Sequence, residues 1–179
     1  MSRLREKYIK EVIPEMKKIF GYKNEFAVPR LIKVTINVGA GRALTDDKFL
    51  DTVKSTLERI SGQKPVFTRA KKSISAFKIR QDMIIGATVT LRGKIMYEFI
   101  DKLINVTLAR VRDFRGLDSK SVDRAGNLTI GFKEHTVFPE IKSDEVERLH
   151  GLSVTINTNA KGQKETLSLF TLLGFPFKK

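Results

Sequence analysis

An alternating run at residues 29–39 constrains the fold of this chain more than any other feature. Its aliphatic positions share one side of an extended backbone: Ile32, Val34, Ile36 and Val38. Its polar positions share the other side: Lys33, Thr35 and Asn37. This period of two predicts a strand that is buried on one face and open to solvent on the other.

Similar patterns predict further strands at 64–69, 85–92, 127–132 and 152–158. Apolar residues three or four apart predict helices at 2–20, 45–60, 94–109 and 163–173, and a short helix at 143–149. Pro14 should kink or interrupt the first helix. Strands and helices mix without strict alternation. The sequence therefore predicts a single α+β domain over 1–179, with a mostly antiparallel sheet, helices on one face and the other face exposed.

Helix ends and stripes give more local expectations. Thr45 and Ser143 are expected N-caps, and Gly21 and Gly174 are expected helix ends. The apolar stripes are expected to place several side chains in the core, among them Met16, Ile19, Ile95, Met96, Phe99, Leu103 and Val106.

The exposed face of the predicted sheet has an unusual composition. It carries short polar side chains and basic ones, with no carboxylate: Lys33, Thr35, Asn37, Thr88, Thr90, Arg92, Asn127, Thr129, Ser153, Thr155 and Asn157. Uncharged donors without acidic neighbours suit a surface that meets phosphates and 2′-hydroxyls. The absence of aromatic residues favours a folded RNA, read by backbone and shape, over stacked single-stranded bases. A plain solvated face is the alternative.

Net charge points the same way. The chain has 34 Lys and Arg against 20 Asp and Glu, a formal charge of +14, and such a field attracts polyanions. The charge is uneven, since residues 62–81 contain six basic residues and no acidic one. Residues 70–82 join two predicted strands, and Ile74 and Phe77 are too few to hold a helix on a core. We therefore predict a mobile basic loop there.

Several classes of chemistry find no support. The chain has no cysteine and only two histidines, His135 and His150, whose spacing resembles no metal site. We interpret both as surface or capping residues. The GxG turn at Gly39 and Gly41 lacks both a third glycine and a following GK[ST]. We therefore expect that the chain is not an enzyme, binds no metal or cofactor, has no membrane segment and is cytoplasmic. The alternative functions are another basic RNA-binding protein, a nucleotide-dependent RNA enzyme that uses the GxG turn, or a membrane-surface protein.

Four segments in order, VTINVGAGRA, ISGQKPVFTRAKKSISAFKIR, GFKEHTVFPEI and LLGFPFKK, resemble the bacterial ribosomal protein L5 family of the large subunit. The resemblance runs essentially end to end. It implies an α+β domain that binds 5S rRNA and helps attach it to 23S rRNA in the central protuberance, beside other proteins. It further implies contact with P-site tRNA and an intersubunit bridge to a protein of the small-subunit head.

The resemblance also assigns residues to each surface. The 5S rRNA surface would include Lys33, Thr35, Asn37, Gly39, Lys64, Thr68, Arg69, Thr88, Thr90 and Arg92. The loop facing tRNA would present Lys71, Lys72, Ser73, Ser75, Phe77, Lys78 and Arg80. Candidates for the bridge lie in two loops, 110–124 and 133–148: Arg112, Arg115, Glu134 and Asp144.

Overall fold

The computed structural model describes residues 2–41, 47–142 and 149–178. Five strands form one sheet in the order β2-β3-β1-β5-β4. The strands are β1 Leu31–Gly39, β2 Val66–Arg69, β3 Ile84–Leu91, β4 Leu128–Phe132 and β5 Leu152–Thr158. This confirms the predicted strands, with end shifts of no more than two residues.

The sheet is antiparallel. Strands β2 and β3 pair with Val66 opposite Thr88 and Thr68 opposite Gly86, and the register shifts between Thr68 and Arg69. Contacts between other neighbouring strands show the same antiparallel direction, because the residue number rises along one strand as it falls along the other. These contacts join Asn37 with Ser153, Arg30 with Asn159, Asn127 with Asn157, and Thr129 with Thr155. The predicted α+β class is confirmed.

The contacts of the chain cluster into two compact units. The first unit comprises Met1–Val34, Leu91–Ile130 and Thr155–Lys179, and the second comprises Thr35–Thr90 and Gly131–Val154. The strands β1, β3, β4 and β5 have residues in both units, so each unit contains part of the sheet and its own helices.

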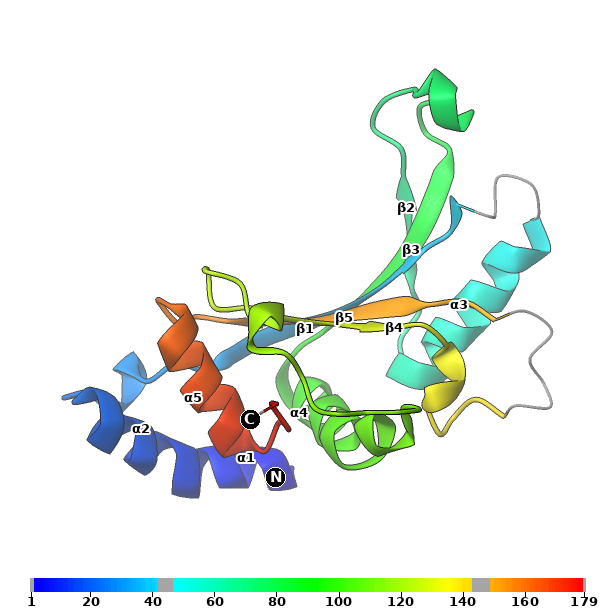
Figure 1. Cartoon of the computed structure of the whole chain (residues 1–179). Helices are drawn as coiled ribbons and strands as arrows, with labels where there is room; N and C mark the ends of the chain where they lie inside the picture. Colours follow the sequence, from blue (N-terminus) through cyan, green and yellow to red (C-terminus); the bar gives the residue numbers. More distant parts are fainter. Residues whose placement is uncertain (1, 42–46, 143–148, 179) are drawn as a thin grey trace. The chain divides into compact units, whose positions relative to one another are not determined.

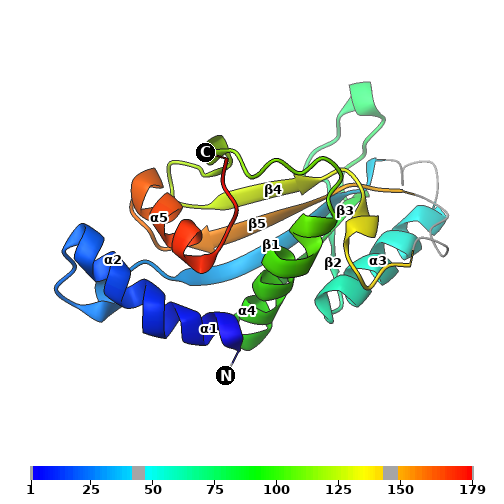
Figure 2. The same ribbon diagram turned by 60° about the horizontal axis from the view of Figure 1, so that its bottom comes forward.

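In the first unit, residues 3–20 form one helical run of α1 Arg3–Lys7, a π-turn η1 Tyr8–Val12 and α2 Ile13–Phe20. Pro14 is the second residue of α2 and lies inside this continuous run, and the α-helical hydrogen bonding is interrupted by the π-turn directly before α2. The run packs on α4 Gly93–Lys102 and on α5 Gln163–Leu173 (Figure 2). Gly21 and Gly174 end α2 and α5 with positive φ, as expected.

Several apolar residues expected in the core are exposed instead: Ile19, Ile32, Ile95 and Val106. The predicted helix at 94–109 contains a π-turn, η5 Leu103–Thr107, before a short 3₁₀ turn, Leu108–Arg110. A π-turn holds more residues than an α-turn and so rotates the stripe. The fully buried position is therefore Thr107 rather than Val106. At the start of β1, Leu31 is buried and its neighbour Ile32 is not.

In the second unit, α3 Asp47–Ser61 buries Phe49, Val53, Leu57 and Ile60, as its spacing predicted. Strands β2 and β3 form a hairpin with a short helical turn at its tip (Figure 1). The expected N-cap Thr45 lies outside the described residues, and so does the expected helix at 143–149 except for its last residue.

Both histidines belong to the core of the second unit. His135 is 1% exposed and His150 is 7% exposed. The Nδ1 atom of His135 accepts a hydrogen bond from the backbone N–H of His150 at 3.3 Å. Our interpretation of these residues as surface or capping histidines is wrong, because isolated histidines show no period that would reveal burial.

Candidate nucleic-acid interface

In the second unit, the polar side of β1 and β3 presents unused hydrogen-bonding groups. Thr35 and Thr90 are half-buried and Asn37 is exposed. Within the part of the chain that the structure describes, none of these three side chains has a hydrogen-bond partner. Their alternation with the buried Val34, Ile36 and Val38 side chains turns them away from the core.

Two neighbouring hydroxyls are already partly used. Thr88 donates its hydroxyl proton to the carbonyl oxygen of Ile36 at 3.1 Å. Ser153 makes a longer contact, 3.4 Å, with the carbonyl oxygen of Asn37. Each hydroxyl oxygen can still accept a hydrogen bond. Thr88 therefore offers a ligand less donor capacity than Thr90.

The β2 side of this surface depends on a close approach. Thr68 pairs with Gly86, and a Cβ atom at Gly86 would lie 2.7 Å from the Val38 carbonyl oxygen and 2.8 Å from the Thr68 hydroxyl. Only glycine lets these strands meet without displacement. Lys64 and Arg69, at the two ends of the β2 region, are both exposed. Gly39, at the end of β1, is also exposed and faces open space.

In the first unit, the polar side of β4 and β5 bonds to itself. The Asn157 amide donates to Asn127 at 3.0 Å, and the hydroxyls of Thr129 and Thr155 share a hydrogen bond of 3.2 Å. Asn127 also donates to a carboxylate, Asp123, at 2.9 Å from its side chain. These polar groups have less capacity left for a ligand than those of β1 and β3.

Asp123 introduces a negative charge beside that self-bonded region. Hydrogen bonds from Asn127, first of all from its backbone N–H, hold the pKa of Asp123 below its ordinary value. The carboxylate therefore stays ionised near neutral pH. Two predicted site residues of this unit lie elsewhere: Lys33 is half-buried on β1, and Arg92 is exposed just before α4.

The basic loop at the hairpin tip has a defined backbone. Ile74 and Ile79 exchange two backbone hydrogen bonds, of 2.8 and 3.1 Å, around the 3₁₀ turn Ser75–Phe77. Ala70 donates to the Met83 carbonyl at 2.9 Å, and the Ser73 hydroxyl accepts from the N–H of Gln81 at 3.0 Å. The segment is a small hairpin rather than an α-helix. Its mobility stays a prediction.

Every side chain predicted to face tRNA is exposed on this loop: Lys71, Lys72, Ser73, Ser75, Phe77, Lys78 and Arg80. Phe77 is 67% exposed, so it is not packed within the loop. A large aromatic side chain exposed on a loop with four cations is available to stack on a base or a ribose.

The structure describes three of the four bridge candidates, two in the first unit and one in the second. Arg112 and Arg115 are exposed in the first unit, in a loop where Asp113 has a positive φ of 53°. Glu134 is exposed in the second unit, before the 3₁₀ turn His135–Val137. Asp144 lies outside the described residues.

Metal binding and membrane spanning find no support among the described residues. Among the described residues, no group of three or more His, Asp or Glu side chains could hold a metal ion. None of the helices in that part of the chain is long and apolar enough to cross a membrane. The open polar surface of β1 and β3 and the basic hairpin at 70–82 present groups that can bind another molecule through the protein surface.

Comparison with known proteins names the family. Residues 24–80 match the family "Ribosomal protein L5", and residues 84–177 match the model for the C-terminus of the same ribosomal family. Proteins named large ribosomal subunit protein uL5 from Halothermothrix orenii and Caldanaerobacter subterraneus are 52% and 53% identical, over the whole of both chains. The relative of that name from Mycoplasma mycoides is 53% identical over 99% of each chain. This chain belongs to the ribosomal protein L5 family and is a ribosomal protein, not an enzyme.

Proposed function

We propose that this chain is a structural protein of the large ribosomal subunit, where it binds 5S rRNA and helps attach it to 23S rRNA in the central protuberance. Its full-length relatives carry the name of a large-subunit protein. The observation that carries the proposal is the open polar surface of β1 and β3, where Thr35, Asn37 and Thr90 are unpartnered among the described residues.

The chemistry of that surface supports a folded RNA as ligand. Hydroxyl and amide groups can bond phosphate oxygens and 2′-hydroxyls, and the basic residues Lys64 and Arg69 of the same unit add attraction to the backbone. The formal charge of +14 would speed encounter with any polyanion. Selectivity for 5S rRNA therefore has to come from shape and from the placement of the polar groups.

A gel-shift titration with 5S rRNA over a salt series tests this role. Binding should weaken steeply as salt rises, because each phosphate contact releases condensed counterions. An unrelated folded RNA of equal length is the control. Equal affinity for both RNAs at physiological salt would contradict the proposal.

We also propose that the 70–82 loop contacts P-site tRNA and that one of the exposed loops contributes to an intersubunit bridge with a small-subunit head protein. The exposed cations and Phe77 of the loop support the first contact. The exposed Arg112, Arg115 and Glu134 side chains support the second. Crosslinking from each position in assembled ribosomes would test both contacts. The absence of any crosslink from the 70–82 loop to tRNA would contradict the first, and the absence of any crosslink from the other loops to the small subunit would contradict the second.

A further inference from the structure

A hollow on the first unit is lined by two arginines and a tyrosine. Its volume is about 310 Å³, and Arg5 of α1, Arg30 and Ile32 at the start of β1, and Gly93 and Tyr97 of α4 line it with Leu31 and Met96. None of its lining residues is acidic. The hollow lies where the start of β1 meets α1 and α4, because Arg5 comes from α1 and Met96 and Tyr97 come from α4.

The two guanidinium groups are uncompensated. Within the described residues, no carboxylate oxygen lies within 4.0 Å of Arg5 or Arg30, and neither side chain forms a hydrogen bond. Nearby acidic groups have other partners, since Asp101 pairs with Arg3 at 3.0 Å and Glu98 with Lys94 at 3.6 Å. Two cations without counterions at one hollow form a site that favours an anion.

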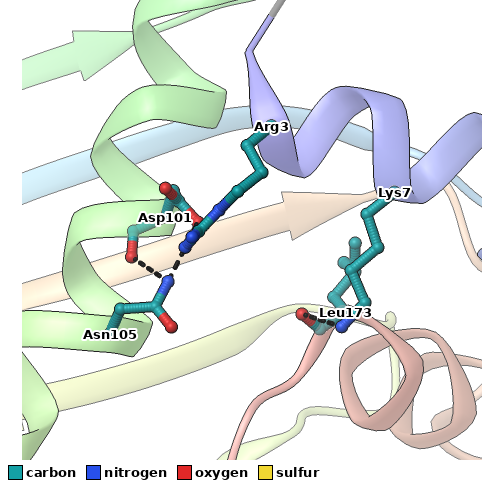
Figure 3. Close-up of polar contacts among 5 residues, drawn as sticks. All are labelled: Arg3, Lys7, Asp101, Asn105 and Leu173. Atoms are coloured by element: carbon teal, nitrogen blue, oxygen red, sulfur yellow. Dashed lines mark hydrogen bonds and ion pairs between the residues drawn. The ribbon is translucent and has the colours of Figure 1, made fainter.

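A larger neighbouring hollow, of about 550 Å³, shows the contrast. There Asn105 and Arg3 both donate to Asp101, and the Lys7 ammonium donates to the Leu173 carbonyl at the end of α5 at 3.3 Å (Figure 3). Arg3 and Lys7 of that hollow therefore each bond to a residue of another helix. Arg5 and Arg30, which line the smaller hollow, form no such contact within the described residues.

The backbone around Arg30 is held in place. Tyr8 donates its hydroxyl to the Pro29 carbonyl at 3.0 Å, and the Arg30 N–H donates to the Asn159 side chain at 2.6 Å. Arg5, Arg30 and Tyr97 line the same hollow. Burial raises the pKa of Tyr97, while the charges of Arg5 and Arg30 act to lower it. The Tyr97 hydroxyl has no partner among the described residues and can donate to the same ligand.

We propose that this hollow binds a backbone phosphate of 23S rRNA, a second RNA segment distinct from the 5S rRNA on the polar surface. The inference rests on the proposed function, because the surroundings define only the chemistry of the ligand, a phosphate. Two guanidiniums can bond its oxygens in pairs, Tyr97 adds a neutral donor, and the start of α4 adds unpaired N–H groups. The apolar floor of Leu31, Ile32 and Met96 fits the flank of a ribose.

The test uses the full chain with Arg5→Gln and Arg30→Gln combined. The matched control combines Lys10→Gln and Lys18→Gln, which removes the same charge from the same helical run, where each lysine lies within 4.0 Å of a glutamate. Both proteins are first titrated with 5S rRNA, and the resulting complexes are then titrated with 23S rRNA. We expect 5S affinity within about twofold of the unsubstituted chain for both proteins.

For 23S rRNA we expect about a tenfold loss of affinity in the arginine variant and not in the lysine control. The salt slope of the arginine variant should be lower by roughly 0.7–1, for the one phosphate that is no longer bound. Tyr97→Phe should cause a smaller loss in the same step. Unchanged 23S affinity, an equal loss in the lysine control, or an equal loss of 5S affinity would each overturn the inference. A failure of the unsubstituted chain to select 5S rRNA would instead contradict the proposed function.

A last arm separates an RNA phosphate from a small anion. The unsubstituted chain and the arginine variant are melted with inorganic phosphate, against chloride of equal ionic strength. If phosphate stabilises only the unsubstituted chain while 23S affinity is the same for both, the hollow is a small-anion site and the RNA assignment is wrong. Loss of 23S affinity in the variant supports the assignment whether or not free phosphate is bound.

Discussion

The imidazole rings of His135 and His150 stack face to face, with their centroids 4.0 Å apart and their planes 9° apart. Phe49 of α3 meets the His150 ring edge-on, at a centroid distance of 6.0 Å. Burial first, and then the neighbouring His135, lower the pKa of His150 to about 4. Burial also lowers the pKa of His135, although Glu134 acts in the opposite direction. The pair is therefore neutral in the folded protein at neutral pH.

This pair should make stability depend on pH. In the unfolded chain His150 binds a proton near its ordinary pKa of 6.5, whereas the folded chain resists protonation until about pH 4. The contribution of neutral His150 to the free energy of unfolding is therefore present above pH 6.5. It should be lost as the pH drops from 6.5 to 4, which lowers the free energy of unfolding by roughly 3 kcal/mol. Urea unfolding at pH 7.5 and pH 4.5 measures the difference. His150→Phe should flatten this dependence; an unchanged slope would show that carboxylates cause it.

Gly86→Ala should destabilise the second unit by roughly 1–3 kcal/mol, because the new methyl group would overlap the Val38 carbonyl oxygen and the Thr68 hydroxyl. Gly131→Ala is the matched control, since a Cβ atom there meets nothing within 4 Å. That control should stay within about 0.5 kcal/mol of the unsubstituted chain. Thermal or urea unfolding checks both variants, and equal stability of the two would refute the close-approach argument.

Asn37→Ala and Thr90→Ala should each weaken 5S rRNA binding by roughly 1–3 kcal/mol, since each would leave a polar RNA group without its partner. Thr129→Ala is the control on the self-bonded part of the sheet, where Thr129 already bonds Thr155. Its affinity should change less than about twofold, by the same argument. Filter-binding titrations at fixed salt measure all three, and a larger effect at Thr129 than at Thr90 would move the site toward β4 and β5.

Phe77→Ala should leave stability within about 0.5 kcal/mol, because the side chain is 67% exposed. Binding of tRNA to the P site of ribosomes containing the variant should weaken by roughly 1–3 kcal/mol if the ring stacks on a base. Binding of 5S rRNA to the free protein should be unchanged. A loss of 5S binding with normal tRNA binding would reverse the assignment of the loop.

Removing charge from the same loop should have a different signature. Lys72→Gln with Lys78→Gln should lower tRNA affinity and reduce its salt dependence by up to about 2, with 5S rRNA affinity little changed. Lys10→Gln with Lys18→Gln again serves as the control for net charge. Equal effects of the two pairs on tRNA would indicate a general field rather than a contact.

Local periodicity was enough for most of the fold. The strand at 152–158 and the helix at 163–173 begin and end at the predicted residues, because alternation and helical spacing are properties of neighbouring residues. The carboxylate-free polar face was also readable from alternation. Prediction was wrong where the helical period changes: the π-turn at Leu103–Thr107 buries Thr107 and exposes Val106.

The sequence by itself determined the α+β class, the basic loop and the polar face, since each follows from local pattern and charge. The tertiary structure decided which polar groups remain free, because hydrogen bonds such as Thr129 with Thr155 join residues 26 positions apart. It also decided the burial of His135 with His150 and the meeting of Arg5, Arg30 and Tyr97. Such groupings depend on distances across the fold, which no local period encodes.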